Sequence, residues 1–213
     1  MIDRPYHHGD LRVALLARAE QTLRESGVDG LSLRELARDV GVSHGAPRRH
    51  FRDKAALLDS LAVEGFHRLA DTFARAAAGA AGRPFPVVLS DVAVAYVTFA
   101  TENPALLELM FTSKHQAEAS AELHRAANSS FDQVAGLVDL GQSCGALVDG
   151  EVEQVGMTLF AMLHGITSLA NTDMIDRDQL PRLTGYAVGS LLHGLAPRHG
   201  TDLGAAPGLA GTD

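Results

Sequence analysis

Residues 31–58 constrain the fold of this chain more than any other stretch. Ser32 is followed three positions later by Glu35, the spacing of a capping box, which predicts that a helix begins here. Four apolar residues then repeat at helical spacing and predict one buried face: Leu33, Leu36, Ala37 and Val40. Gly41 follows at once, where a left-handed residue commonly ends a helix, and Ser43 is placed to cap a second, short helix.

The segment after Gly41 carries basic and polar side chains and predicts a helix-turn-helix, whose second helix enters the major groove of DNA. Small residues allow a close approach to bases, and the free N–H groups at the start of the next helix suit a phosphate. The expected contacts to phosphates or base edges are Ser32, Arg34, Ser43, Arg48, His50 and Lys54. The residues expected nearest the bases are His44, Gly45, Ala46 and Arg49. The alternative is a small amphipathic pair of helices with a solvated basic face.

The run GVSHGAPRRHFRDKAALL, residues 41–58, resembles the DNA-binding segment of TetR-family transcriptional regulators. The matching positions are Gly41, Val42, Ser43, His50, Phe51, Lys54, Leu57 and Leu58. The opening YHHGDLR, residues 6–12, resembles the start of one subgroup of that family, whose ligand domain often contains Trp-His-Gly. Here the matching place holds Leu163, His164 and Gly165.

Two residues depart from the family pattern. Arg48 stands where the family usually has Tyr, a common phosphate contact, and an Arg side chain is also able to contact phosphate. Pro47 lies inside the short helix, where it removes an amide donor and biases Ala46 away from the helical region. We therefore expect a recognition helix that starts late or is strained.

The charge of the chain is divided unevenly. The overall net charge is −8, but residues 1–54 carry +2 and residues 55–213 carry −10. This asymmetry indicates that a weakly basic head meets DNA while the acidic body is repelled, and that binding needs two heads. The chain shows no secretory signal and no apolar run that approaches about 18 residues. With the single Cys144, expected to be a buried thiol, this predicts a cytoplasmic protein without membrane association.

Helical periodicity without any strand pattern predicts an all-α protein of about nine helices. We expect a three-helix DNA-binding domain over 1–53, a helical ligand-binding and dimerisation domain over 54–196, and a disordered tail over 197–213. Besides those of the head, the expected helices are 54–79, 84–101, 104–111, 115–142, 151–171 and 178–195.

The last two helices, 151–171 and 178–195, have wide apolar surfaces and suit pairing with a second copy of the chain. A two-fold DNA site also requires a two-fold protein. The resemblance implies the same, because the last two long helices of TetR-like proteins form a four-helix bundle across the two-fold axis. The alternative is that both faces fill the core of a single chain.

Apolar and aromatic residues from several helices are expected around the centre of the body, and the resemblance implies a cavity for a small-molecule effector there. The candidates are Tyr96, Phe99, Leu107, Met110, Phe111, Phe131, Met157, Phe160 and His164. An enzyme is not expected, since the sequence has no His-Glu-x-x-His motif, Cys cluster or nucleophile elbow. For the same reason we expect no metal and no cofactor.

These observations predict a ligand-responsive, homodimeric transcriptional regulator that binds double-stranded DNA, most simply a repressor on a palindromic operator. The competing hypothesis is a helical adaptor that binds another protein and has no sequence-specific contact with DNA. The identity of the effector is not encoded in any motif of the chain.

Overall fold

The computed structural model describes residues 8–195, which form eight α-helices and two short 3₁₀ helices without a β-strand. The α-helices are α1 (His8–Ser26), α2 (Leu33–Val40), α3 (Lys54–Ala77), α4 (Phe85–Glu102), α5 (Pro104–Ser113), α6 (Ala121–Ser143), α7 (Val152–Asn171) and α8 (Leu180–Leu195). The 3₁₀ helices are η1 (Pro47–Arg49) and η2 (Arg177–Gln179). The all-α prediction is confirmed. One fewer α-helix than expected is present in this part of the chain, because the second element of the helix-turn-helix is η1. The expected tail 197–213 lies outside the described residues.

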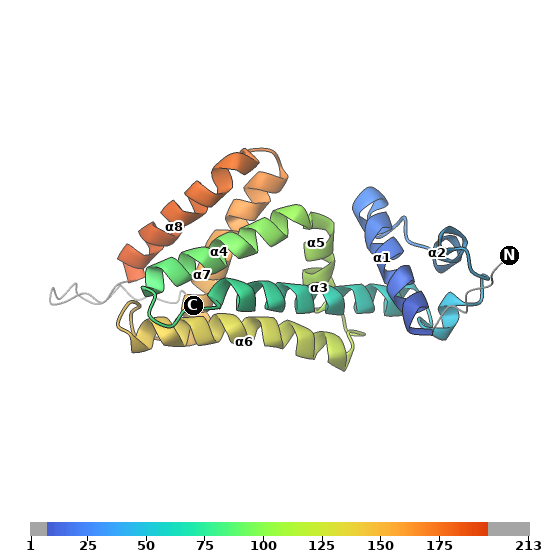
Figure 1. Ribbon diagram of the computed structural model, residues 1–213, viewed down its shortest axis with the longest axis horizontal. Helices are drawn as coiled ribbons and strands as arrows, with labels where there is room; N and C mark the ends of the chain where they lie inside the picture. The colour runs from blue at the N-terminus through green and yellow to red at the C-terminus, as the bar shows by residue number, and fades with distance from the viewer. Residues whose placement is uncertain (1–7, 196–213) are drawn as a thin grey trace, which may run out of the picture.

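The head consists of α1, α2 and η1 and lies at one end of the elongated molecule (Figure 1). Its core is formed by side chains with almost no exposed surface, among them Leu15, Leu36 and Phe51. Gly41 ends α2 with φ 78° and ψ 31°, the left-handed conformation that the sequence predicted.

The predicted capping box at the start of α2 is wrong in one respect. Ser32 is the N-cap residue, with φ −143° and ψ 126°, but its side chain makes no capping hydrogen bond. The helix nevertheless begins at Leu33, with the amide of Leu36 donating to the Ser32 carbonyl at 2.9 Å. Leu31, 3% exposed, anchors the incoming chain in the core instead.

Helix α3 links the head to the body (Figure 1). The carboxylate of Asp53 caps it by accepting a hydrogen bond from the Ala56 amide at 2.8 Å. Its 24 residues extend over about 36 Å at 1.5 Å per residue. Its apolar side belongs to one hydrophobic cluster that runs without interruption from Leu15 in α1 to Leu180 in α8. Head and body therefore share a core.

The body surrounds the far half of α3. Helices α4 and α6 flank α3, α5 crosses between α3 and the head, and α7 and α8 pack on α4 at the opposite end (Figure 1). Helix α4 is long and apolar enough to cross a membrane by length and composition, contrary to the expectation that no segment would be. More than half of that helix is buried among α3, α7 and α8, which is the position of a core helix.

Helix α6 begins at Ala121 rather than near residue 115. Ser120 caps it, with its hydroxyl oxygen accepting from the Leu123 amide at 3.0 Å. The carboxylate of Asp59 on α3 holds Ser120 in turn, accepting from its amide at 2.9 Å and its hydroxyl at 2.7 Å. This clamp joins α3 to the start of α6.

Cys144, just after α6, is exposed, so the expectation of a buried thiol is wrong.

Candidate nucleic-acid interface and ligand cavity

The second element of the helix-turn-helix is a 3₁₀ turn. The amides of Arg49 and His50 donate to the carbonyls of Ala46 and Pro47 at 3.2 and 2.9 Å, each three residues back. Pro47 has no N–H with which to close an α-helical bond to the Ser43 carbonyl, which instead accepts from the Ala46 amide at 2.9 Å. The α-helix expected here is therefore replaced by η1, and Pro47 is buried. The expected bias of Ala46 away from the helical region is wrong, because Ala46 has helical φ −62° and ψ −43°.

The ten predicted DNA contacts lie at the start of α2, within residues 43–50 around η1, and at the first residue of α3. Six are exposed: Arg34, Ser43, His44, Gly45, Arg48 and Arg49. Four are partly exposed: Ser32, Ala46, His50 and Lys54. The Nε2 atom of His50 is buried without a hydrogen-bond partner among the described residues. A Cβ atom built on Gly45 would meet no atom within 4 Å, so packing within the protein does not require glycine there.

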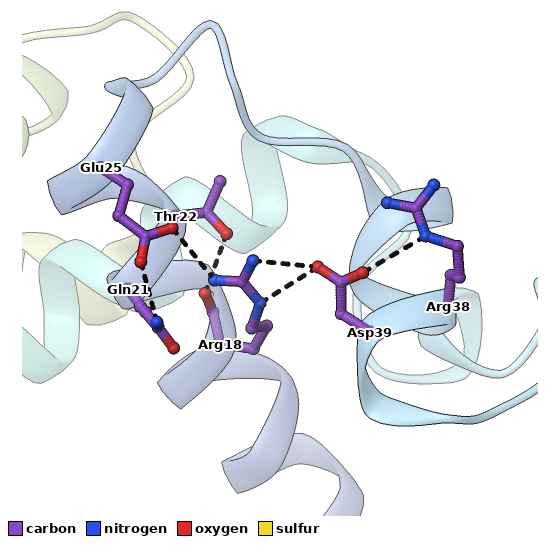
Figure 2. A network of polar contacts seen from close by, with 6 residues as sticks. All are labelled: Arg18, Gln21, Thr22, Glu25, Arg38 and Asp39. Carbon is purple, nitrogen blue, oxygen red and sulfur yellow. Dashed lines mark hydrogen bonds and ion pairs between the residues drawn. The ribbon is translucent and has the colours of Figure 1, made fainter.

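The basic side chains of the head fall into two sets. In the first set each guanidinium lies within 4 Å of a carboxylate; its members are Arg12, Arg18, Arg24, Arg38 and Arg52. Figure 2 shows the centre of this set, where Arg18 of α1 lies between Glu25 and Asp39 and donates to Asp39 at 3.1 Å. This bond fixes α2 against α1.

The second set has no carboxylate partner. Among residues 8–195, no ion pair or side-chain hydrogen bond is formed by Arg34, Arg48, Arg49 or Lys54. All four were predicted to contact DNA. Lys54 is the first residue of α3, so its ammonium adds to the positive end of a 24-residue helix. The four unpaired cations and this helix end make a surface suited to phosphate.

The body encloses a cavity of about 320 Å³ between α3, α6 and α7. Six aromatic residues line it: Phe66, Phe73, Tyr96, Phe111, Phe131 and Phe160. Aliphatic and small residues complete the apolar wall: Leu69, Val134, Ala135, Val152, Gly156 and Met157. The polar lining residues are Ser130, Asp132 and Glu153, of which the two acids are exposed. Such a cavity has the size and the apolar character of a small-molecule site.

Five of the nine residues expected around the cavity line it: Tyr96, Phe111, Phe131, Met157 and Phe160. Phe99, Leu107 and Met110 are buried in the hydrophobic cluster and lie outside its wall. His164 also lies outside the lining, but its Nδ1 is 3.1 Å from the Tyr96 hydroxyl and its ring stacks on Phe160, with centroids 5.3 Å apart. His164 therefore contacts two lining residues without lining the cavity itself.

Several lining residues were missed by sequence reasoning. Phe66, Leu69 and Phe73 belong to the apolar stripe of α3, which looks the same in a sequence whether it faces packed atoms or a void. Asp132 and Glu153 look like ordinary solvated charges of α6 and α7.

Two ionisable groups at the cavity are perturbed by burial. Burial raises the pKa of the Tyr96 hydroxyl well above its usual range, so this group stays neutral and available for hydrogen bonding. Burial also lowers the pKa of the Lys114 ammonium. That ammonium lies 4.3 Å from the ring centroid of Phe131 and 5.0 Å from that of Phe111. Among the described residues, no cluster of three or more His, Cys, Asp or Glu side chains could hold a metal ion.

Among the described residues, a helix-turn-helix head with unpaired cations is joined to an all-helical body that contains an apolar cavity, and this architecture indicates the class of DNA-binding transcriptional regulators. Comparison with known proteins gives the family. Residues 15–61 match the bacterial regulatory proteins of the tetR family, and residues 89–182 match the tetracyclin repressor-like C-terminal domain. The chain belongs to the TetR family.

Individual relatives are similar over different lengths. The tetracycline repressor protein class D of Escherichia coli is 42% identical over 53 residues, 25% of this chain and 24% of that repressor. The class A repressor from transposon 1721 is 58% identical over 40 residues, 19% of this chain and 18% of that repressor. These matches thus span about a quarter or less of the curated relatives.

Solved structures match over nearly the whole chain. A Rhodococcus sp. RHA1 protein of unknown function is 42% identical, with a TM-score of 0.84 over 92% of this chain and all of that one. A regulatory protein of the tetR family from Rhodococcus RHA1 has a TM-score of 0.71 at 17% identity, over 89% of this chain and 98% of that one, and shares the fold.

Proposed function

We propose that this protein is a ligand-responsive, homodimeric transcriptional repressor that binds a palindromic operator in double-stranded DNA. Family membership supports a DNA-binding regulator, and the dimer, the ligand and the repressor role are our proposals. We further propose residues 1–53 as the DNA-binding domain, residues 54–196 as the ligand and dimerisation domain, and the cytoplasm as the location. The proposed DNA contacts are those predicted from the sequence.

One observation carries the DNA-binding proposal. Residues 8–54 contain nine arginines and lysines, and the four without a carboxylate partner among the described residues all lie where a helix-turn-helix would meet DNA. An exposed ion pair contributes little to the free energy of folding. The division into five paired and four unpaired cations therefore affects mainly the electrostatic potential outside the head. Phosphates would supply the missing partners.

The outer faces of α7 and α8 support the homodimer. Leu169 on α7 is 41% exposed and Tyr186 on α8 is 75% exposed, although both are large hydrophobic side chains. Gly165 on α7 and Gly189 on α8 would both accept a Cβ atom without meeting any atom within 4 Å. Large apolar groups beside small ones suit close packing of helices from a second copy. Two heads would then reach half-sites about 34 Å apart, one turn of DNA.

The cavity and the head are connected through α5, which supports ligand control. Phe111 near the end of α5 lines the cavity, while Asn103, Pro104 and Ala105 near its start lie against Leu23 of α1. A ligand that binds one position of α5 better than another would shift the separation of the two heads. A coupling of about 1–3 kcal/mol would change operator affinity by about 5–150-fold.

The experiment that tests this function is a selection from random double-stranded DNA with the purified protein at low salt. We expect enrichment of a palindrome, and no enrichment with the double variant Arg48→Ala, Arg49→Ala. Absence of any enriched sequence would instead favour the adaptor hypothesis. A change of promoter output in a reporter strain then distinguishes repression from activation.

A further inference from the structure

The wall of the cavity in the body carries two acidic side chains besides its apolar residues. Asp132 and Glu153 line it, and among the described residues neither carboxylate forms an ion pair or a hydrogen bond. No lining residue is cationic. The Lys114 ammonium, which lies beside the cavity, would balance only one of these two negative charges.

The aromatic wall already holds a cation. The Lys114 ammonium lies over Phe131 and Phe111, whose rings both line the cavity, at 4.3 and 5.0 Å from their centroids. Ring faces are electron-rich and attract ammonium groups within about 6 Å. Burial lowers the pKa of Lys114, which means that this position destabilises the charged form of its side chain. Lys114 therefore acts as an internal stand-in for a cationic ligand.

We propose that the effector of this cavity is an apolar organic cation, such as an arylalkyl ammonium, held by the aromatic rings and balanced by Asp132 and Glu153. This inference rests on the proposed function, because it names the chemical class of the effector. An anionic ligand would be repelled by two carboxylates at the wall, and a neutral one would gain no attraction from them. A ligand ammonium would also be able to displace the Lys114 side chain from the rings of Phe111 and Phe131.

The cavity volume is consistent with a small ligand of this class. At about 320 Å³ it lies at the lower end of ligand pockets, which span about 300–1,000 Å³. The carboxylates are exposed and Met157 is 62% exposed, so the charged groups surround the opening while the rings form the interior. The ammonium end of a ligand would therefore lie nearer the opening and its apolar end nearer Phe66 and Phe73.

The test uses three probes of similar shape and different charge: benzyltrimethylammonium, its neutral isostere neopentylbenzene, and phenylacetate. Their binding to the full-length protein is measured by ligand-observed NMR titration. We expect the cation to bind about two- to thirtyfold more tightly than the isostere, the range of a cation–π interaction. Equal or tighter binding of the isostere, or no saturable binding of any probe, overturns the proposal.

Variants identify the groups responsible. The double variant Asp132→Asn, Glu153→Gln should lower the preference for the cation to the part that the aromatic rings supply and leave binding of the isostere unchanged, whereas Asp139→Asn, on α6 but outside the cavity, should change neither. Lys114→Met should tighten binding of the cation because it removes the competing ammonium. If Lys114→Met instead abolishes tight binding of phenylacetate, the cavity is an anion site and the proposal fails.

Binding of these probes is measured without DNA, so its outcome is separate from the operator selection. An enriched palindrome without a preference for the cation would refute the ligand class and leave the regulator standing. A cation preference that follows the variants, in a protein that enriches no DNA sequence, would leave the cation site standing and refute the regulator.

Discussion

Replacing Lys54 by Ala should change how strongly DNA binding depends on salt. Each phosphate contact contributes about 0.9 to the slope of log K against log salt concentration. Arg34, Arg48 and Lys54, the unpaired cations expected at phosphates, give six contacts in a dimer, so the intact protein should have a slope of about −5. A fourfold rise in salt would then weaken binding by about 10³-fold.

Because both heads carry the substitution, Lys54→Ala should remove two contacts and reduce the slope by about 1.8. A reduction of about 0.9 would indicate that a single head is bound. Lys54 forms no ion pair among the described residues and is partly exposed, so the fold should be little affected.

The assay is fluorescence anisotropy with the selected operator between about 50 and 200 mM salt. Arg24→Ala is the matched control, because it removes one positive charge from the same head. Arg24 pairs with Glu20 and lies where α1 meets α5, away from η1. An unchanged slope in Lys54→Ala, or an equal reduction in Arg24→Ala, would refute the division of the head cations into paired and DNA-facing sets.

Three further substitutions test the packing and the site. A Cβ atom on Gly65 would lie 2.6 Å from the Met110 sulfur, so Gly65→Ala should lower the free energy of unfolding by about 1–3 kcal/mol in urea denaturation, and an unchanged midpoint would contradict this close contact. Gly45→Ala meets no internal atom, so it should leave stability unchanged or raise it by up to about 1 kcal/mol while weakening operator binding; full binding would remove Gly45 from the interface. Asp53→Ala should cost about 1 kcal/mol of stability through the lost cap of α3, whereas Asp53→Asn should retain most of it; equal losses would assign the effect to charge.

Local chemistry made the ends of several elements predictable from the sequence. Gly41 ends α2 as expected and α3 begins at residue 54 as expected, because the end groups involved act on atoms within four residues of themselves. Ser32 shows the limit of such rules, since α2 begins there without the side-chain bond. Pro47 was expected to disturb the recognition helix, and it converts that helix to η1.

The cavity was less predictable, for a physical reason. Hydrophobic periodicity indicates that a side chain is buried, but it does not distinguish contact with other atoms from contact with a void. Tyr96 and Phe111 line the cavity, whereas Leu107 and Met110, with the same pattern, fill the core. Asp132 and Glu153 line the cavity only because of the way in which α6 and α7 approach each other, and this approach cannot be read from either helix alone.

The hydrophobic cluster that runs from Leu15 to Leu180 has a consequence for recombination. A chimera that joins the first 53 residues of this chain to the body of a relative would cut through that cluster. Leu15 and Phe51 of the retained head would then meet side chains of different volume, and mismatched cores cost stability in both directions. Exchange of DNA specificity should therefore succeed when only the surface of residues 43–50 is transplanted, and heat should melt both ends of the molecule in one transition.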